Sequence, residues 1–88
     1  MPWTCESVRE KLVSLLVEHL GVEPSEITDE KSVKDLGGDS LDQAELVLAF
    51  EEEFCLTISD NDADMHFQTV GSTVEYLCEK VSVAPTAA

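Results

Sequence analysis

A single serine, Ser40, lies between acidic residues where a glycine-containing loop changes into a helical pattern. Gly37 and Gly38 precede it and would leave the approach open to a second protein, and Asp39 adjoins it. Ser40 and Gln43 have the spacing of a capping box, so the hydroxyl could simply cap the helix. Asp39 can cap the same helix one position earlier, which would free that hydroxyl. A phosphate ester on Ser40 would then lie beside the unpaired N–H groups of the first turn, at the positive end of the helix dipole.

The other residues capable of chemistry do not form a catalytic motif. Activation of Ser40 as a hydrolase nucleophile needs a base, and His19 and His66 are distant in the sequence. The three cysteines are odd in number and have no paired spacing, so we expect thiols that act as small apolar residues in a reducing compartment. They are Cys5, Cys55 and Cys78. We therefore predict no catalytic residue.

A calcium site is an alternative use for the acids Asp60, Asp62 and Asp64, whose spacing matches the start of an EF-hand loop. The rest of the segment does not match an EF-hand loop, because Met65 stands where the loop requires a glycine and Gly71 where it requires a bidentate glutamate. We expect at most a weak surface cation site, and no metal that serves the function.

The first helix and the loop after it are predicted from caps and apolar spacing. Thr4 or Ser7 can begin the helix, and Gly21 stands where a helix commonly ends. Residues 22–39 then lose all periodicity and are rich in turn-forming residues. A loop of this length in a compact domain is often functional.

Three further helical segments follow the loop. The second helix is expected over Ser40–Phe54 and a short turn over Asp60–Met65, while Ser72 and Glu75 have capping-box spacing at the start of the last helix. No strand pattern occurs. The sequence predicts an all-α fold, a small four-helix bundle of three main helices and one short helix. Residues 1–82 would form the domain and residues 83–88 a disordered tail.

The charge of this 88-residue chain is strongly acidic, at −14. Twelve acids and no Lys or Arg occur from residue 35 to residue 79. Such a surface repels nucleic acid and anionic membranes and attracts basic protein surfaces. The first ten residues contain no apolar run of the length that a signal peptide or a membrane span requires. We expect a cytoplasmic protein that binds neither nucleic acid nor membrane.

The second helix has apolar residues on two opposite faces. Its core stripe consists of Leu46, Val47, Phe50 and Phe54. Leu41 and Leu48 lie on the other side, next to Glu45 and Glu52. Exposed leucines flanked by acids indicate a docking surface for a basic partner, although single surface leucines are common.

Three segments of the chain resemble the acyl carrier protein family, in particular its free-standing bacterial members that serve fatty acid synthesis. The stretch DLGGDSLDQAELVLAFEEEF resembles the attachment region, whose hallmark D-S-L is here residues 39–41. DADMHFQTVGSTVEYL is similar to the short third helix and the start of the fourth, and LVEHLGVEPSEIT to the end of the first helix and the next loop. The likeness covers about residues 5–81.

The resemblance implies a carrier rather than an enzyme. In that family the serine matching Ser40 carries 4′-phosphopantetheine, a covalent arm derived from coenzyme A whose thiol holds an acyl group as a thioester. The implied partners are a phosphopantetheinyl transferase and the acyl-transferring and fatty acid synthesis enzymes, through basic patches, with the carrier as a monomer. Polyketide, aminoacyl or D-alanyl cargo on the same arm is the alternative.

The resemblance also assigns residues to docking and to cargo. The docking residues that it implies are Asp39, Leu41, Asp42, Glu45, Leu48, Glu51, Glu52, Ile58 and Asp60. The residues implied to line the acyl cavity are Leu46, Val47, Phe50, Ile58, Ala63 and Leu77.

Two segments depart from the family pattern. KSVKDLGGDS is one residue shorter than the usual loop, in which a large apolar residue follows the position of Ser32. ADMHFQTV is one residue longer, and Phe67 is expected in the apolar position that the usual register gives to His66. Both changes border the expected cavity and so affect its size.

Overall fold

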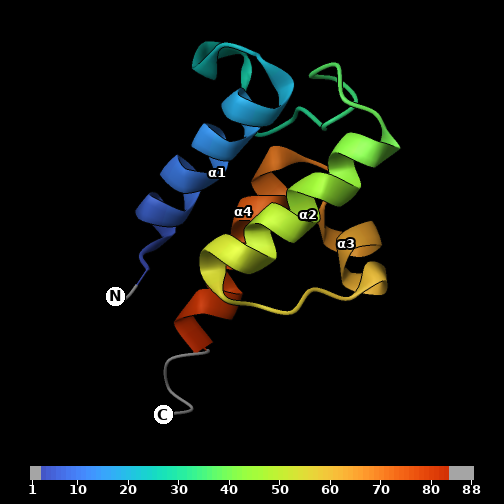
Figure 1. The fold of residues 1–88 in the computed structure, drawn as a ribbon. Helices are drawn as coiled ribbons and strands as arrows, with labels where there is room; N and C mark the ends of the chain where they lie inside the picture. Colours follow the sequence, from blue (N-terminus) through green and yellow to red (C-terminus); the bar gives the residue numbers. More distant parts are fainter. Residues whose placement is uncertain (1–2, 84–88) are drawn as a thin grey trace.

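The structure is a computed structural model that describes residues 3–83, which form four α-helices and one short 3₁₀ turn (Figure 1). The elements in chain order are α1 (Cys5–Leu20), η1 (Pro24–Glu26), α2 (Ser40–Phe54), α3 (Asp60–His66) and α4 (Val70–Val83). The predicted helical bundle is confirmed, with α2 at its predicted boundaries. α1 packs against both α2 and α4, while α3 packs against α4.

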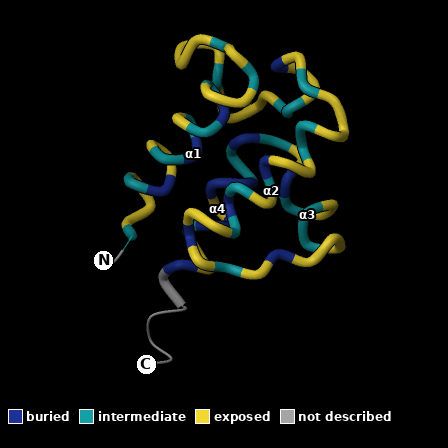
Figure 2. The backbone as a smooth tube through the Cα atoms, in the orientation of Figure 1, coloured by how far each residue is buried: buried dark blue, intermediate teal, exposed yellow. Residues whose placement is uncertain are grey.

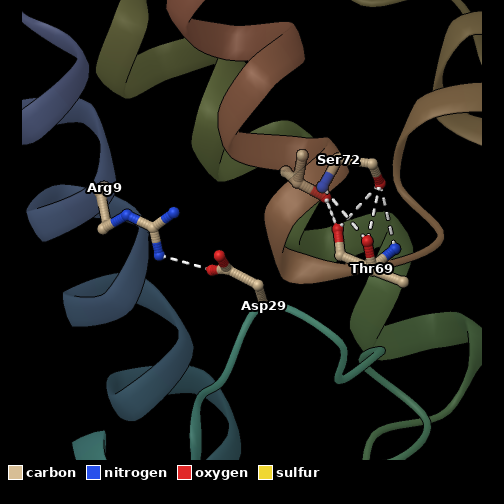
Figure 3. Close-up of polar contacts among 5 residues, drawn as sticks. Arg9, Asp29, Thr69 and Ser72 are labelled. Atoms are coloured by element: carbon tan, nitrogen blue, oxygen red, sulfur yellow. Dashed lines mark hydrogen bonds and ion pairs between the residues drawn. The ribbon is translucent and has the colours of Figure 1, made fainter.

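The caps explain where the helices begin and end. Thr4 caps α1, because its hydroxyl accepts a hydrogen bond from the Ser7 N–H at 3.0 Å, and Ser7 returns the contact. Gly21 ends this helix in the left-handed conformation, with φ 67°. The prediction that Ser72 caps the last helix was wrong: α4 begins at Val70, and Thr69 accepts from the Ser72 N–H at 3.1 Å (Figure 3). Ser72 is instead the third residue of α4, three positions after the capping residue Thr69.

The core lies between α1, α2 and α4, and each of these helices has stretches coloured as buried in Figure 2. The buried residues of α1 and α2 are Val8, Leu12, Leu16, Leu46, Phe50 and Phe54. Phe67 is also buried. Its ring makes edge-to-face contacts with the rings of Phe50 and Tyr76, with centroid distances of 5.7 Å and 5.4 Å. His66 is only half-buried. The register expected from the inserted residue is confirmed, since Phe67 takes the apolar position.

The loop between α1 and α2 is tied to two helices. Asp29 accepts from the guanidinium of Arg9 on α1 at 2.6 Å, as Figure 3 shows. The Asp29 carbonyl accepts from the Gly71 N–H at 3.0 Å, and the Lys31 carbonyl from the Val70 N–H at 2.8 Å. The loop therefore satisfies N–H groups that the first turn of α4 cannot pair internally.

The expectation of three thiols was wrong for two of them. Cys5 and Cys78 form a disulfide, with Cα atoms 5.1 Å apart and a sequence separation of 73 residues, and Cys55 remains free and exposed. Antiparallel packing brings the first residue of α1 beside α4, and no local spacing could reveal that pairing (Figure 1). Because two of the three cysteines are paired, the cysteines no longer indicate a reducing compartment.

The predicted domain boundary at residue 82 falls inside α4, which continues to Val83. The remainder of the predicted tail, residues 84–88, lies outside the described residues. Within the part of the chain that the structure describes, no helix has both the length and the apolar character that a membrane crossing requires.

Candidate functional site

Ser40 is the first residue of α2 and is exposed to solvent. Asp39 caps this helix, because its carboxylate accepts from the Asp42 N–H at 2.9 Å while the Asp42 carboxylate accepts from the Asp39 N–H at 3.0 Å. The Asp42 N–H, by its hydrogen bond, holds the pKa of Asp39 below its ordinary value. Among residues 3–83 the Ser40 hydroxyl has no hydrogen-bond partner. The two sequence alternatives are thereby separated: Asp39 is the cap, and Ser40 is free.

The two glycines before the site shape the loop that leads into α2. Gly37 has φ 93°, a conformation that favours glycine. A Cβ atom on Gly38 would lie 2.5 Å from the Val33 side chain, and the Gly38 N–H donates to the Val33 carbonyl at 2.8 Å. The loop therefore folds back on itself immediately before α2.

A groove of about 620 Å³ begins at Ser40 and lies between α2 and the segment that contains α3. Of the residues predicted to line a cavity, Val47, Ile58 and Ala63 line this groove. Leu46 and Phe50 instead border a separate apolar cavity of about 20 Å³. Leu77 is fully buried and lines neither space, so its predicted role as a cavity residue is not supported.

Sequence reasoning missed Gln43 and Ala44, which line the groove nearest to Ser40. Their positions follow from helix geometry, because residues three and four positions after Ser40 lie on the same face of α2.

The outer face of α2 presents the predicted apolar pair to solvent. Leu41 is 66% exposed and Leu48 is 60% exposed, and Glu45 and Glu52 are exposed as well. Glu45 lies 3.6 Å from the ring of His19. Asp60, at the start of α3, is also exposed.

Four other predicted docking residues have internal roles. Asp39 and Asp42 form the capping box of α2. Ile58 is only 6% exposed, so it is not available to a partner, and its N–H donates to the Glu51 carboxylate at 2.7 Å. Of the predicted docking residues, Ile58 alone is buried, whereas Asp39 stays exposed and Asp42 and Glu51 are half-buried.

Known proteins match this chain over most of its length. The phosphopantetheine attachment site family matches residues 10–77, a range that includes Ser40. The acyl carrier protein of Caulobacter vibrioides is 46% identical over 76 residues, which are 85% of this chain and 96% of the relative. The acyl carrier protein of Phenylobacterium zucineum is 47% identical over 75 residues, covering 84% and 94%. The chain belongs to the acyl carrier protein family.

The structural comparison agrees with this membership. The solved structure of the acyl carrier protein from Enterococcus faecalis superimposes with a TM-score of 0.75 at 37% sequence identity, covering 88% of this chain and 98% of that one. The four-helix arrangement described above is therefore shared with a member of the acyl carrier protein family.

The site has the features that the phosphopantetheine arm of this family requires. An ester on an exposed serine at a helix N-terminus places its phosphate beside N–H groups that lack intrahelical partners. The groove then offers a path from Ser40 between α2 and α3. Gln43 and Ala44 line this groove together with Ser40.

The far side of α3 is held by α4. The Tyr76 hydroxyl donates to the Asp62 carboxylate at 2.8 Å, and the His66 ring stacks on Tyr76 with centroids 4.9 Å apart. This contact engages Asp62, one of the three acids of the calcium alternative. Among the described residues, no group of three or more His, Cys, Asp or Glu side chains is arranged to hold a metal ion.

We expect the only tyrosine of the sequence, Tyr76, to ionise near pH 12 rather than near pH 10. Burial disfavours the phenolate, and the hydrogen bond to Asp62 raises the pKa further, to about 12. The contribution of the protonated Tyr76 hydroxyl to the free energy of unfolding is complete below about pH 10. It is lost as the pH rises through about 12. Ultraviolet absorbance of the phenolate measures the midpoint directly. Asp62→Asn should lower that midpoint, and a wild-type midpoint near 10 would contradict the contact.

Proposed function

We propose that this protein carries acyl groups as thioesters on a 4′-phosphopantetheine arm esterified to Ser40. The observation that carries the proposal is the free, exposed Ser40 hydroxyl at the first residue of α2, at the end of a groove. When attached, the arm supplies a terminal thiol that accepts and releases the acyl group. The carrier serves fatty acid synthesis, as its family membership indicates. The names of its relatives favour acyl cargo over aminoacyl or D-alanyl cargo.

The protein's own residues would hold and present the arm rather than catalyse a reaction. Asp39 and Asp42 fix the first turn of α2, so the Ser40 hydroxyl is offered to an incoming enzyme in a set position. The chemistry of loading and transfer then belongs to the partners, a phosphopantetheinyl transferase and the enzymes of fatty acid synthesis. We expect the carrier to act as a monomer, and its cytoplasmic location stays a prediction.

Mass spectrometry tests the attachment directly. The protein is incubated with coenzyme A and a phosphopantetheinyl transferase, and its intact mass is measured before and after. We expect the mass of one 4′-phosphopantetheine group to be added, and fragmentation should locate it on Ser40. No added mass, or an arm on another serine, would refute the proposal.

The exposed acids of α2 are expected to steer basic partners. Glu45→Lys combined with Glu52→Lys should slow association with the phosphopantetheinyl transferase about tenfold or more, because attraction becomes repulsion. Stopped-flow association rates at several salt concentrations measure this, and added salt should slow the wild-type protein in the same direction.

A control with the same net charge separates steering from overall charge. Glu6→Lys combined with Glu10→Lys alters two exposed acids on the side of α1 opposite its buried residues, and should retain most of the wild-type rate. Equal slowing in both double variants would show that net charge alone matters. Rates that respond neither to reversal nor to salt would remove the steering argument.

A further inference from the structure

The groove beside Ser40 has two walls, and only one of them is part of α2. The α2 wall belongs to a continuous helix of 15 residues, but the opposite wall consists of Ile58 and residues of α3. α3 packs against α4 and is joined to α2 by an extended connection (Figure 1). The width of the groove therefore depends on what holds this connection against α2.

Glu51 makes that contact. Its carboxylate accepts the Ile58 N–H at 2.7 Å, a bond that is partly buried and spans seven residues. The backbone carbonyl of Glu51 also accepts the N–H groups of Cys55 and Leu56, which end α2. One residue thus ends the helix and holds the segment that follows it.

Ile58 is well placed to transmit this contact to the groove. Its side chain is 6% exposed and lines the groove, and the next residue, Ser59, caps α3 by accepting from the Asp62 N–H at 3.1 Å. On the far side, the Tyr76 hydroxyl holds Asp62 at 2.8 Å. α3 is thus held by α4 on one side and by Glu51 through Ile58 on the other.

We propose that Glu51 is a positioning residue that fixes the Ile58 wall of the groove and thereby sets how well the groove shelters an acyl chain. This inference rests on the proposed carrier function. It separates Glu51 from its neighbour Glu52, which is exposed and makes no such contact among the described residues. A hydrogen bond to a charged group is stronger than a neutral one, so its loss should be measurable.

Two substitutions at position 51 distinguish reach from charge. Glu51→Asp keeps the charge but shortens the side chain, so the carboxylate can no longer reach the Ile58 N–H. Glu51→Gln removes the charge but keeps an acceptor oxygen at the same reach. If Glu51 acted only by docking, Glu51→Gln would abolish its effect, because the charge is removed. If Glu51 positions Ile58, Glu51→Asp abolishes its effect, because the carboxylate no longer reaches the N–H.

The first measurement is amide hydrogen exchange of Ile58 in the protein without the arm. We expect exchange about tenfold faster in Glu51→Asp, corresponding to loss of one charge-assisted hydrogen bond, and part of the protection kept in Glu51→Gln, whose neutral acceptor makes a weaker bond. Glu52→Asp and Glu52→Gln are the matched controls and should leave Ile58 unchanged. Unchanged exchange in Glu51→Asp, or equal acceleration in Glu52→Asp, would overturn the inference.

The second measurement is the rate at which hydroxylamine cleaves an octanoyl thioester on the arm. We expect faster cleavage in Glu51→Asp than in wild type, Glu51→Gln or either Glu52 variant, because a loosened wall exposes the chain. Equal cleavage rates in all five proteins would overturn the sheltering role even if Ile58 exchange changed. A protein that accepts no arm would refute the proposed function instead, and Ile58 exchange would still decide the role of Glu51.

Discussion

Ser40→Ala is expected to lose all loading of the phosphopantetheine arm and to keep its fold. The variant lacks the oxygen that would form the ester. Its helix should remain, because Asp39 and Asp42 provide the capping box and alanine is the residue that favours helices most. Intact mass after incubation with coenzyme A and a transferase should equal the starting mass. The free energy of unfolding should stay within about 0.5 kcal/mol of wild type.

Ser59→Ala is a matched control with the opposite expectation. Ser59 caps α3, where its hydroxyl accepts the Asp62 N–H, and its loss should cost about 1 kcal/mol of stability. Because Ser59 is not at the start of α2, the variant should still accept one arm. Loading of Ser40→Ala, or failure of Ser59→Ala to load while folded, would contradict the assignment of the attachment residue.

Local signals in the sequence predicted the helices well. Thr4, Gly21 and the apolar spacing of α2 act within one or two turns, so their effect can be read from neighbouring residues. Ser72 was misassigned because Thr69 and Ser72 can both cap, and the choice between them depends on contacts of the distant loop with α4. The sequence likewise left Ser40 with two roles, and the capping box formed by Asp39 distinguishes them.

Contacts between distant residues could not be predicted in this way. The Cys5–Cys78 pair depends on how α1 lies against α4, and the Glu51–Ile58 hydrogen bond on how the chain turns after α2. The resemblance assigned Glu51 and Ile58 to docking by position alone. The burial of Ile58 and its hydrogen bond to Glu51 required the structure, because a helical projection cannot show what covers a residue from another segment.

The disulfide between α1 and α4 is expected to make the largest single contribution to stability that a reagent can remove. Closing a loop across a separation of 73 residues restricts the unfolded chain, so reduction should lower the free energy of unfolding by about 2–4 kcal/mol. Urea unfolding with and without a small dithiol measures this difference. Cys5→Ser and Cys78→Ser should each match the reduced wild type, and the dithiol should not affect them further.

Cys55→Ser provides the control, because this third cysteine is exposed and outside the bond. Its stability should remain sensitive to the dithiol to the same extent as that of the wild type. Alkylation of free thiols of the wild-type protein in freshly lysed cells, followed by mass spectrometry, would count one cysteine thiol if the bond forms in the cell and three if it does not, in addition to the thiol of any attached arm. If the oxidised and reduced proteins unfold at the same urea concentration, the packing of α1 against α4 is sufficient by itself to hold the two cysteines together, and the bond does not stabilise the bundle.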